Sequence, residues 1–136
     1  MNAVLAVVIV DDDVDHAVIA RVVVSQVAPE ASVEVMTDPR MLAERLVEAP
    51  HGAIVFVDRR LDGHDGIALL AALHEERDDL CLVLLSAALT DEDRRAALAS
   101  GAQAAFEKPG SLHGWRALIA AVLQQSERRV RTQAAA

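Results

Sequence analysis

The stretch VVIVDDDVDH, residues 7–16, joins a run of β-branched apolar residues directly to three consecutive aspartates. The apolar run is short enough to be a buried β-strand. Carboxylates that lie this close together repel one another. The aspartates therefore either form a solvated loop at the end of the strand or surround a positively charged group.

The rest of the chain alternates short apolar runs with segments of helical spacing. Strands are expected at residues 3–10, 32–36, 53–58, 80–86 and 104–108, and helices at residues 14–27, 38–49, 67–77, 91–100 and 111–125. Asp38 and Pro39 are typical of a helix start, and Gly101 is typical of a helix end. Five strands that alternate with five helices predict a doubly wound α/β fold. Its parallel sheet would have the flavodoxin-like order 2-1-3-4-5, with helices on both faces.

The composition indicates one domain with a core of small aliphatic side chains. The chain has 136 residues, of which 53% are hydrophobic and 2% aromatic. The formal net charge of −8 argues against a nucleic-acid-binding surface, which needs a basic patch. Cys81 lies in an apolar run and is expected to be buried. Because no secretion signal and no apolar run of about 20 residues is found, we expect a soluble, cytoplasmic protein that does not bind a membrane.

In the predicted strand order, the first and third strands are neighbours, and their carboxyl ends meet at the usual ligand site. Residues 11–13 follow the first of these strands and Asp58 ends the third, while Ser86 and Lys108 end the fourth and fifth. Several carboxylates that face one pocket require a cation, and hard oxygen ligands suit Mg²⁺. A hydroxyl and a lysine beside Asp58 suit the oxygens of a phosphoryl group.

These residues, in this order, resemble the receiver domain of two-component response regulators, of the CheY-like kind, over about residues 4–123. The matching motifs are Asp11-Asp12, Asp58, Asp65-Gly66, Ser86-Ala87 and Lys108-Pro109. The resemblance implies a phosphoacceptor domain at residues 1–124. Residues 125–136 would form a polar tail that is disordered or a frayed extension of the last helix.

The resemblance also implies the roles of the acidic residues. Asp58 would be the nucleophile that takes a phosphoryl group from a sensor histidine kinase or a phosphotransfer protein. Asp12 would bind Mg²⁺ directly and Asp11 largely through water. Asp58 and the backbone carbonyl of Arg60 would complete the protein ligands of the ion.

On the other side of the acceptor, Lys108 would pair with the phosphoryl oxygens and Ser86 would donate a hydrogen bond to one of them. The Lys108–Pro109 peptide is often cis in this family. The protein would be a switch and not an enzyme, since it catalyses only its own phosphorylation and dephosphorylation. Its other partner would be a downstream protein, and it could form a homodimer.

Other polar and aromatic residues are expected to have structural roles. Asp13 and Asp15 would cap and charge the first helix. Asp62 and Asp65 would form turns together with the glycines that follow them. Trp115 would be a packing anchor, and the five histidines, which lack metal-ligand spacing, would lie on the surface.

The sequence departs from the family pattern at several positions. Arg60 and Ala88 flank the path of the hydrolytic water in the family, and Asp62 replaces a usual proline. The aromatic residue that commonly moves on activation is replaced by Ala105, while Phe106 would point to the opposite face of its strand. The signal would therefore leave through the loop after Ser86 and the polar helix that follows it.

Two alternatives compete with this interpretation. An apolar strand followed by Asp-x-Asp also occurs in haloacid-dehalogenase-like phosphatases, in which Asp11 would be the nucleophile and Asp13 the general acid. The chain lacks the length for a cap domain, and its Asp78-Asp79 pair precedes a strand where such enzymes need a pair after one. The other alternative is a receiver-like module that binds proteins without phosphorylation.

Overall fold

The computed structural model describes residues 5–135, with the exception of the side chains of Ala43 and of residues 130–135. Its main sheet contains β1 (Ala6–Val10), β2 (Ser32–Met36), β3 (Ile54–Asp58), β6 (Cys81–Ser86) and β7 (Ala104–Glu107). All of its neighbouring strands are parallel, in the order β2-β1-β3-β6-β7. The predicted 2-1-3-4-5 order is therefore confirmed.

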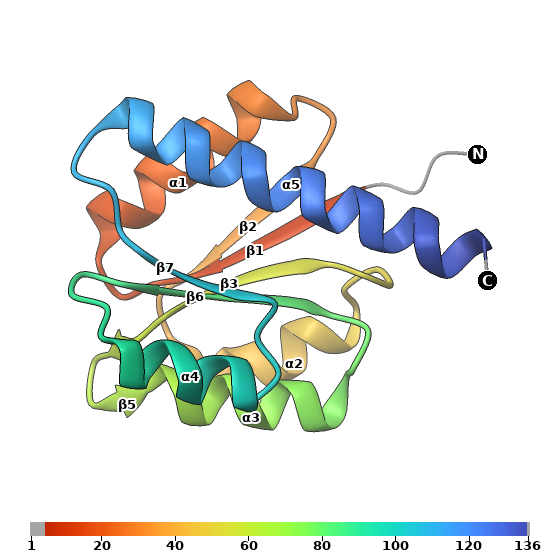
Figure 1. Cartoon of the computed structure of the whole chain (residues 1–136). Coiled ribbons are helices and arrows are strands. Elements are labelled where there is room, and N and C mark those ends of the chain that lie inside the picture. The colour runs from red at the N-terminus through yellow and green to blue at the C-terminus, as the bar shows by residue number, and fades with distance from the viewer. Residues whose placement is uncertain (1–4, 136) are drawn as a thin grey trace.

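Helices cover both faces of this sheet (Figure 1). On one face lie α1 (Val14–Val27) and α5 (Leu112–Ala135), which also pack against each other. On the other face lie α2 (Leu42–Val47), α3 (Gly66–Glu76) and α4 (Asp91–Ala99). This arrangement is the one that alternating strands and helices produce when each crossover is right-handed.

The core consists of two apolar layers, one on each face of the sheet. Alternation along β3 supplies both layers, since Val55 and Val57 face α2, α3 and α4 while Ile54 and Phe56 face α1 and α5. Trp115 is buried in the second layer, as is Cys81. The expected core of mainly small aliphatic side chains is thus present, with Trp115 packed into it as predicted and Phe56 buried in the same layer.

The connection after β3 differs from the loop that the sequence predicts. It contains a short antiparallel hairpin of β4 (Arg60–Leu61) and β5 (His64–Asp65). Asp62 and Gly63 both have positive φ, at 38° and 83°. An Asp-Gly pair with positive φ at both residues is typical of a tight hairpin turn, and strands of two residues are too short to give a periodic pattern.

The helix boundaries also differ in two places. The segment after Asp38 begins as a 3₁₀ turn, η1 (Pro39–Met41), before α2, and α2 ends two residues earlier than predicted. Helix α5 continues to Ala135, and the guanidinium of Arg129 lies 3.5 Å from the carbonyl oxygens of Asp79 and Leu80. The predicted tail is therefore helical through residue 135, and its last residue lies outside the described part of the chain.

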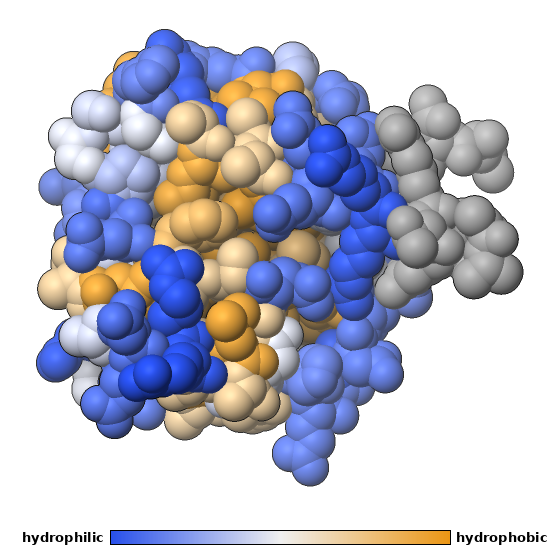
Figure 2. Space-filling model, in the orientation of Figure 1, coloured by the Kyte–Doolittle hydropathy of each residue, from blue (hydrophilic) through white to orange (hydrophobic). Residues whose placement is uncertain are grey.

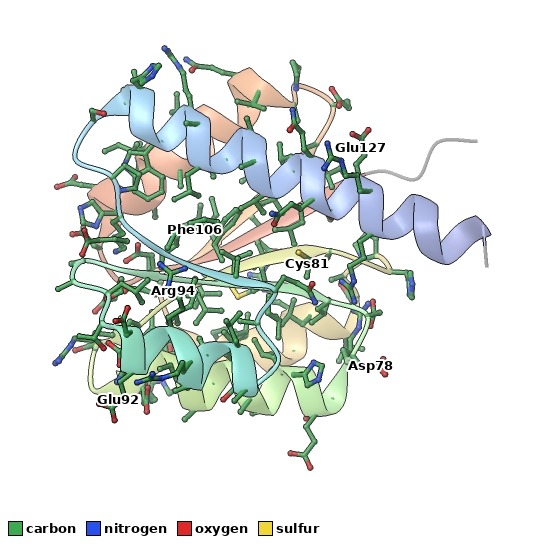
Figure 3. The ribbon with its side chains drawn as sticks, in the orientation of Figure 1. Asp78, Cys81, Glu92, Arg94, Phe106 and Glu127 are labelled. Atoms are coloured by element: carbon green, nitrogen blue, oxygen red, sulfur yellow. The ribbon has the colours of Figure 1, made fainter. Side chains whose placement is uncertain are left out.

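Strand β7 presents its two central side chains to opposite faces of the sheet. Ala105 is fully buried in the layer between the sheet and helices α3 and α4. Phe106 lies on the opposite face and packs against the layer that contains Trp115 (Figure 3). The predicted orientation of both residues is confirmed. In the core between the sheet and α4, β7 therefore offers only the methyl group of Ala105, while Glu107 Oε1 accepts from the backbone N–H of Leu89, just before α4, at 3.2 Å.

Figure 2 shows the surface formed by α5, β7 and α4. Hydrophobic residues gather between the two helices, and hydrophilic residues cover much of α4.

None of the helices in the described part of the chain has both the length and the apolar composition that a bilayer span requires.

The start of α3 is packed directly against the end of β3, so a substitution there tests the fold. A Cβ atom on Gly66 would lie 2.0 Å from the carbonyl oxygen of Asp58, whereas a Cβ on Gly110 would meet no heavy atom within 4 Å. We expect Gly66→Ala to lower the free energy of unfolding by about 2–3 kcal/mol, and Gly110→Ala to change it by less than about 0.5 kcal/mol. Urea denaturation would measure both values. Equal stability of the two variants would contradict this packing.

Candidate functional site

Four strands of the sheet bring polar side chains to one edge. Asp11 and Asp12 follow β1, Asp58 ends β3, Ser86 ends β6 and Lys108 follows β7. Ligand oxygens of the three aspartates lie within 4.8 Å of one another. The structure therefore brings together the residues that the sequence predicts at this edge.

Lys108 joins the two buried aspartates of this cluster. Its Nζ lies 2.8 Å from Asp11 Oδ2 and 3.0 Å from Asp58 Oδ2, and its side chain is only 6% exposed. The backbone N–H of Lys108 donates to the carbonyl of Ser86, at 2.8 Å. The structure has no cis peptide among its described residues, so the Lys108–Pro109 bond differs from the form that is often found in the family. The hydrogen bond to Ser86 holds Lys108 in place with a trans peptide.

The charges in the cluster alter one another's protonation. Burial raises the pKa of Asp11 to about 6, although hydrogen bonds from Lys108 and from the backbone of Asp13 act in the opposite direction. Burial alone would lower the pKa of Lys108, but the hydrogen bonds and charges of Asp11 and Asp58 outweigh it and raise that pKa. Lys108 is therefore a firmly charged ammonium group, and it faces more carboxylates than it can neutralise.

The remaining aspartates of the first loop divide into two roles. Asp12 is exposed, and its Oδ2 accepts a hydrogen bond from the backbone N–H of Asp62, at 2.8 Å. Asp13 is the N-cap of α1, because its Oδ1 accepts from the backbone N–H groups of Asp15 and His16. The predicted capping role of Asp13 is confirmed, and this carboxylate is directed at the helix.

A divalent cation fits the donors at this edge. Asp11, Asp12 and Asp58 each offer one carboxylate oxygen to a common point. Hard oxygen donors from a rigid scaffold, with one exposed side open to water, match the preference of Mg²⁺. Arg60 lies on the same loop, and its backbone N–H donates to Asp58 Oδ1 at 3.3 Å.

Asp58 and Ser86 open into a cavity of about 370 Å³. Its lining residues are Asp12, Asp13, His16, Asp58, Arg59, Arg60, Ser86, Ala87, Ala88, Asp93 and Lys108. The buried hydroxyl of Ser86 accepts a hydrogen bond from the backbone N–H of Ala88, at 3.3 Å. The cavity therefore presents a carboxylate beside a hydroxyl and an ammonium group, and the last two can bind the oxygens of an anionic group.

The structure adds three residues to this cavity that the sequence analysis did not assign to it. His16 was expected on the surface, yet its Nδ1 lies 3.0 Å from Lys108 Nζ. Arg59 directly follows Asp58 and pairs with Asp93 from the first turn of α4, at 3.3 Å. His16 lies in the first turn of α1, directly after the aspartates of the first loop, and this closeness in sequence is a usable signal. No local pattern indicates that Arg59 and Asp93 meet, since 34 positions separate them.

Comparisons with known proteins agree with this geometry. The family model described as "Response regulator receiver domain" matches residues 7–124. The transcriptional regulatory protein BasR of Escherichia coli K12 is 34% identical over 90 residues, which cover 66% of this chain and 40% of BasR.

Two solved structures have a similar fold. NtrX from Brucella abortus has a TM-score of 0.82 at 22% identity, covering 98% of this chain and 30% of its own. A CheY-like receiver domain protein from Methanospirillum hungatei JF-1 has a TM-score of 0.78 at 19% identity, covering 93% and 99% of the two chains. At these identities the two structures establish the fold alone.

The raised pKa of Asp11 gives a prediction about pH. In the metal-free protein, we expect the carboxyl carbon of Asp11 to titrate near pH 6, as followed by ¹³C NMR. Asp79, whose pKa the hydrogen bond from Arg77 lowers to about 2, is the internal reference. Because the folded state holds the Asp11 proton more tightly than the unfolded state does, this group's contribution to stability falls as the pH rises from about 4 to 6.

Addition of Mg²⁺ should lower the Asp11 midpoint, because a cation favours the carboxylate form. An Asp11 midpoint near pH 4 without metal would contradict the burial of its charge.

Proposed function

Because the chain belongs to the response regulator receiver domain family, we propose that it accepts a phosphoryl group on Asp58. The family is one of signalling switches. The observation that carries the proposal is the cavity in which the Asp58 carboxylate lies beside Asp11, Asp12 and the buried Lys108. The donor would be a phosphohistidine on a sensor histidine kinase or a phosphotransfer protein.

The proposed transfer is a displacement at phosphorus. An oxygen of Asp58 forms a bond to phosphorus while the bond from phosphorus to the donor histidine nitrogen breaks, which leaves an acyl phosphate on Asp58. Lys108, now shared between Asp11 and Asp58, would move its charge to the phosphoryl oxygens. The hydroxyl of Ser86 would turn from accepting the Ala88 N–H to donating a hydrogen bond to one of these oxygens.

Asp11, Asp12, Asp58 and the backbone carbonyl of Arg60 would hold Mg²⁺. Its positive charge would offset that of the carboxylates and of the arriving phosphoryl group. The hydrogen bond from the Arg60 N–H to Asp58 Oδ1 holds this part of the loop beside the acceptor carboxylate. Removing the Asp12 side chain would take away the one exposed carboxylate among these ligands and would therefore weaken the binding of the ion.

The result of phosphorylation would be a change in protein binding. The matched part of the chain spans about 40% of BasR. The face formed by α4, β7 and α5 combines an apolar centre with a charged helix, which suits a protein partner or a second copy of the chain (Figure 2).

The two alternatives have less support. In the phosphatase alternative Asp13 is a general acid, but its carboxylate caps α1 and accepts two backbone hydrogen bonds. In the phosphorylation-independent alternative the buried cluster of Asp11, Asp58 and Lys108 would have no use. A purely structural cluster is costly, because Asp11 is held with a raised pKa.

A direct test is labelling with acetyl phosphate and Mg²⁺, followed by intact-mass and peptide mass spectrometry. We expect one phosphoryl group per chain, located on Asp58, and none in Asp58→Asn. Asp62→Asn is the matched control, since its side chain lies outside the cavity lining and asparagine tolerates a φ of 38°. Equal labelling of Asp58→Asn and the native chain would show that the acceptor is another residue.

The lifetime of the phosphoryl group gives a further prediction. Arg60 lines the cavity as a long cation, and Ala88 offers no side-chain group to orient a water molecule. We therefore expect slow hydrolysis of the acyl phosphate. Arg60→Asn should speed its decay by about 2- to 10-fold, which corresponds to a barrier lower by about 0.4–1.4 kcal/mol. Decay measured by phosphate release that is unchanged or slower in this variant would remove the support for shielding by Arg60.

A further inference from the structure

Arg59 links the phosphoacceptor strand to α4. Its backbone is fixed, since its N–H donates to the carbonyl of Leu85 at 2.7 Å and its carbonyl accepts from Gly66 at 2.9 Å. Its guanidinium reaches Asp65 Oδ1 at 2.6 Å and Asp93 Oδ1 at 3.3 Å. Asp65 caps α3 and Asp93 lies in the first turn of α4. One side chain next to Asp58 therefore holds the starts of two helices.

The same ion pair borders the cavity of Asp58. Both Arg59 and Asp93 line it, and their side chains are only 25% and 23% exposed. An acyl phosphate on Asp58 would carry about two negative charges in place of the single charge of the carboxylate, and it would bring them closer to Arg59 and Asp93. Such a group attracts a guanidinium, which binds phosphate oxygens through two parallel hydrogen bonds, and repels the Asp93 carboxylate.

Helix α4 is held weakly enough to respond. Ala97 is its one buried residue within the described structure, while α1 buries four. Most side chains of α4 are exposed, among them Glu92 at its outer side (Figure 3). Thr90 caps the helix through the N–H of Asp93, at 3.0 Å. With so little apolar contact, the position of the first turn depends on its polar links.

We propose that Arg59 transmits the state of Asp58 to α4. In the unphosphorylated protein Arg59 pairs with Asp93 and holds the first turn of α4 against the loop after β3. Phosphorylation transfers the guanidinium to the phosphoryl oxygens and releases Asp93, so the first turn of α4 becomes free to move. Ala105 cannot supply this link from β7, because it has no side chain beyond Cβ. The inference rests on the proposed phosphorylation of Asp58.

The test is amide hydrogen exchange at residues 91–95, measured before and after acetyl phosphate and Mg²⁺, with mass spectrometry of the same samples to quantify phosphorylation. In the native chain, phosphorylation should raise the exchange rate of these amides about 2- to 5-fold, because the loss of one partly exposed ion pair changes local stability by about this factor. In Arg59→Met, which leaves the sequence of these amides unchanged, exchange should be raised already and phosphorylation should add nothing. Asp93→Asn is a second variant with the same expected loss of response.

Arg40→Met is the matched control, because it also removes an arginine–aspartate pair, Arg40 with Asp38 at 3.0 Å, but at η1. This variant should respond to phosphorylation as the native chain does. An unchanged exchange rate at residues 91–95 in phosphorylated native protein, or a native response in Arg59→Met, would overturn the role of Arg59. Neither result would contradict the phosphorylation of Asp58. Absence of a phosphoryl group on Asp58 would overturn the proposed function together with this inference.

Discussion

The buried ammonium group of Lys108 is the interaction on which the site depends. It lies between Asp11 and Asp58, which would otherwise be two carboxylates of like charge in a partly dry pocket. One ammonium group faces the carboxylates of both Asp11 and Asp58, and burial keeps the pKa of Asp11 raised in spite of it. The cluster is therefore satisfied in its hydrogen bonds and still deficient in positive charge. Such a deficit would favour a divalent cation, and the charge of that cation would in turn offset the charge of an anionic ligand.

The parallel sheet is what allows this deficit to persist. The site residues stand at the carboxyl ends of four parallel strands, and these strands are fixed by apolar side chains on both faces. The energy that holds the carboxylates together comes from this burial, which is far larger than the repulsion at one edge. Gly66 shows how closely the edge is packed, since even a methyl group there would meet the backbone of Asp58. A flexible loop could not keep like charges so close without a bound ion.

The sequence was sufficient to predict those features that a local pattern or the order of the strands determines. Apolar runs and helical spacing predicted the five main strands and their order, and the order alone placed Asp11, Asp12, Asp58, Ser86 and Lys108 at one edge. It was insufficient where side chains from distant segments choose partners. The pairing of Arg59 with Asp93 depends on how far α4 sits from the loop after β3, and His16 enters the cavity through the orientation of α1. The β4–β5 hairpin was missed because two-residue strands carry no periodicity.

The edge of the sheet that holds the charge deficit also borders the helix with the least apolar packing. These two properties support each other, because a change of charge can move an element only if little burial opposes the movement. Helix α1, at the same edge, buries four residues and packs against α5, so it resists such a change. Helix α4 buries only Ala97 among its described residues and carries charges of both signs in its first turns. A single arginine beside the acceptor can therefore bias α4 while the rest of the sheet remains fixed, and no aromatic side chain on β7 is needed for that coupling.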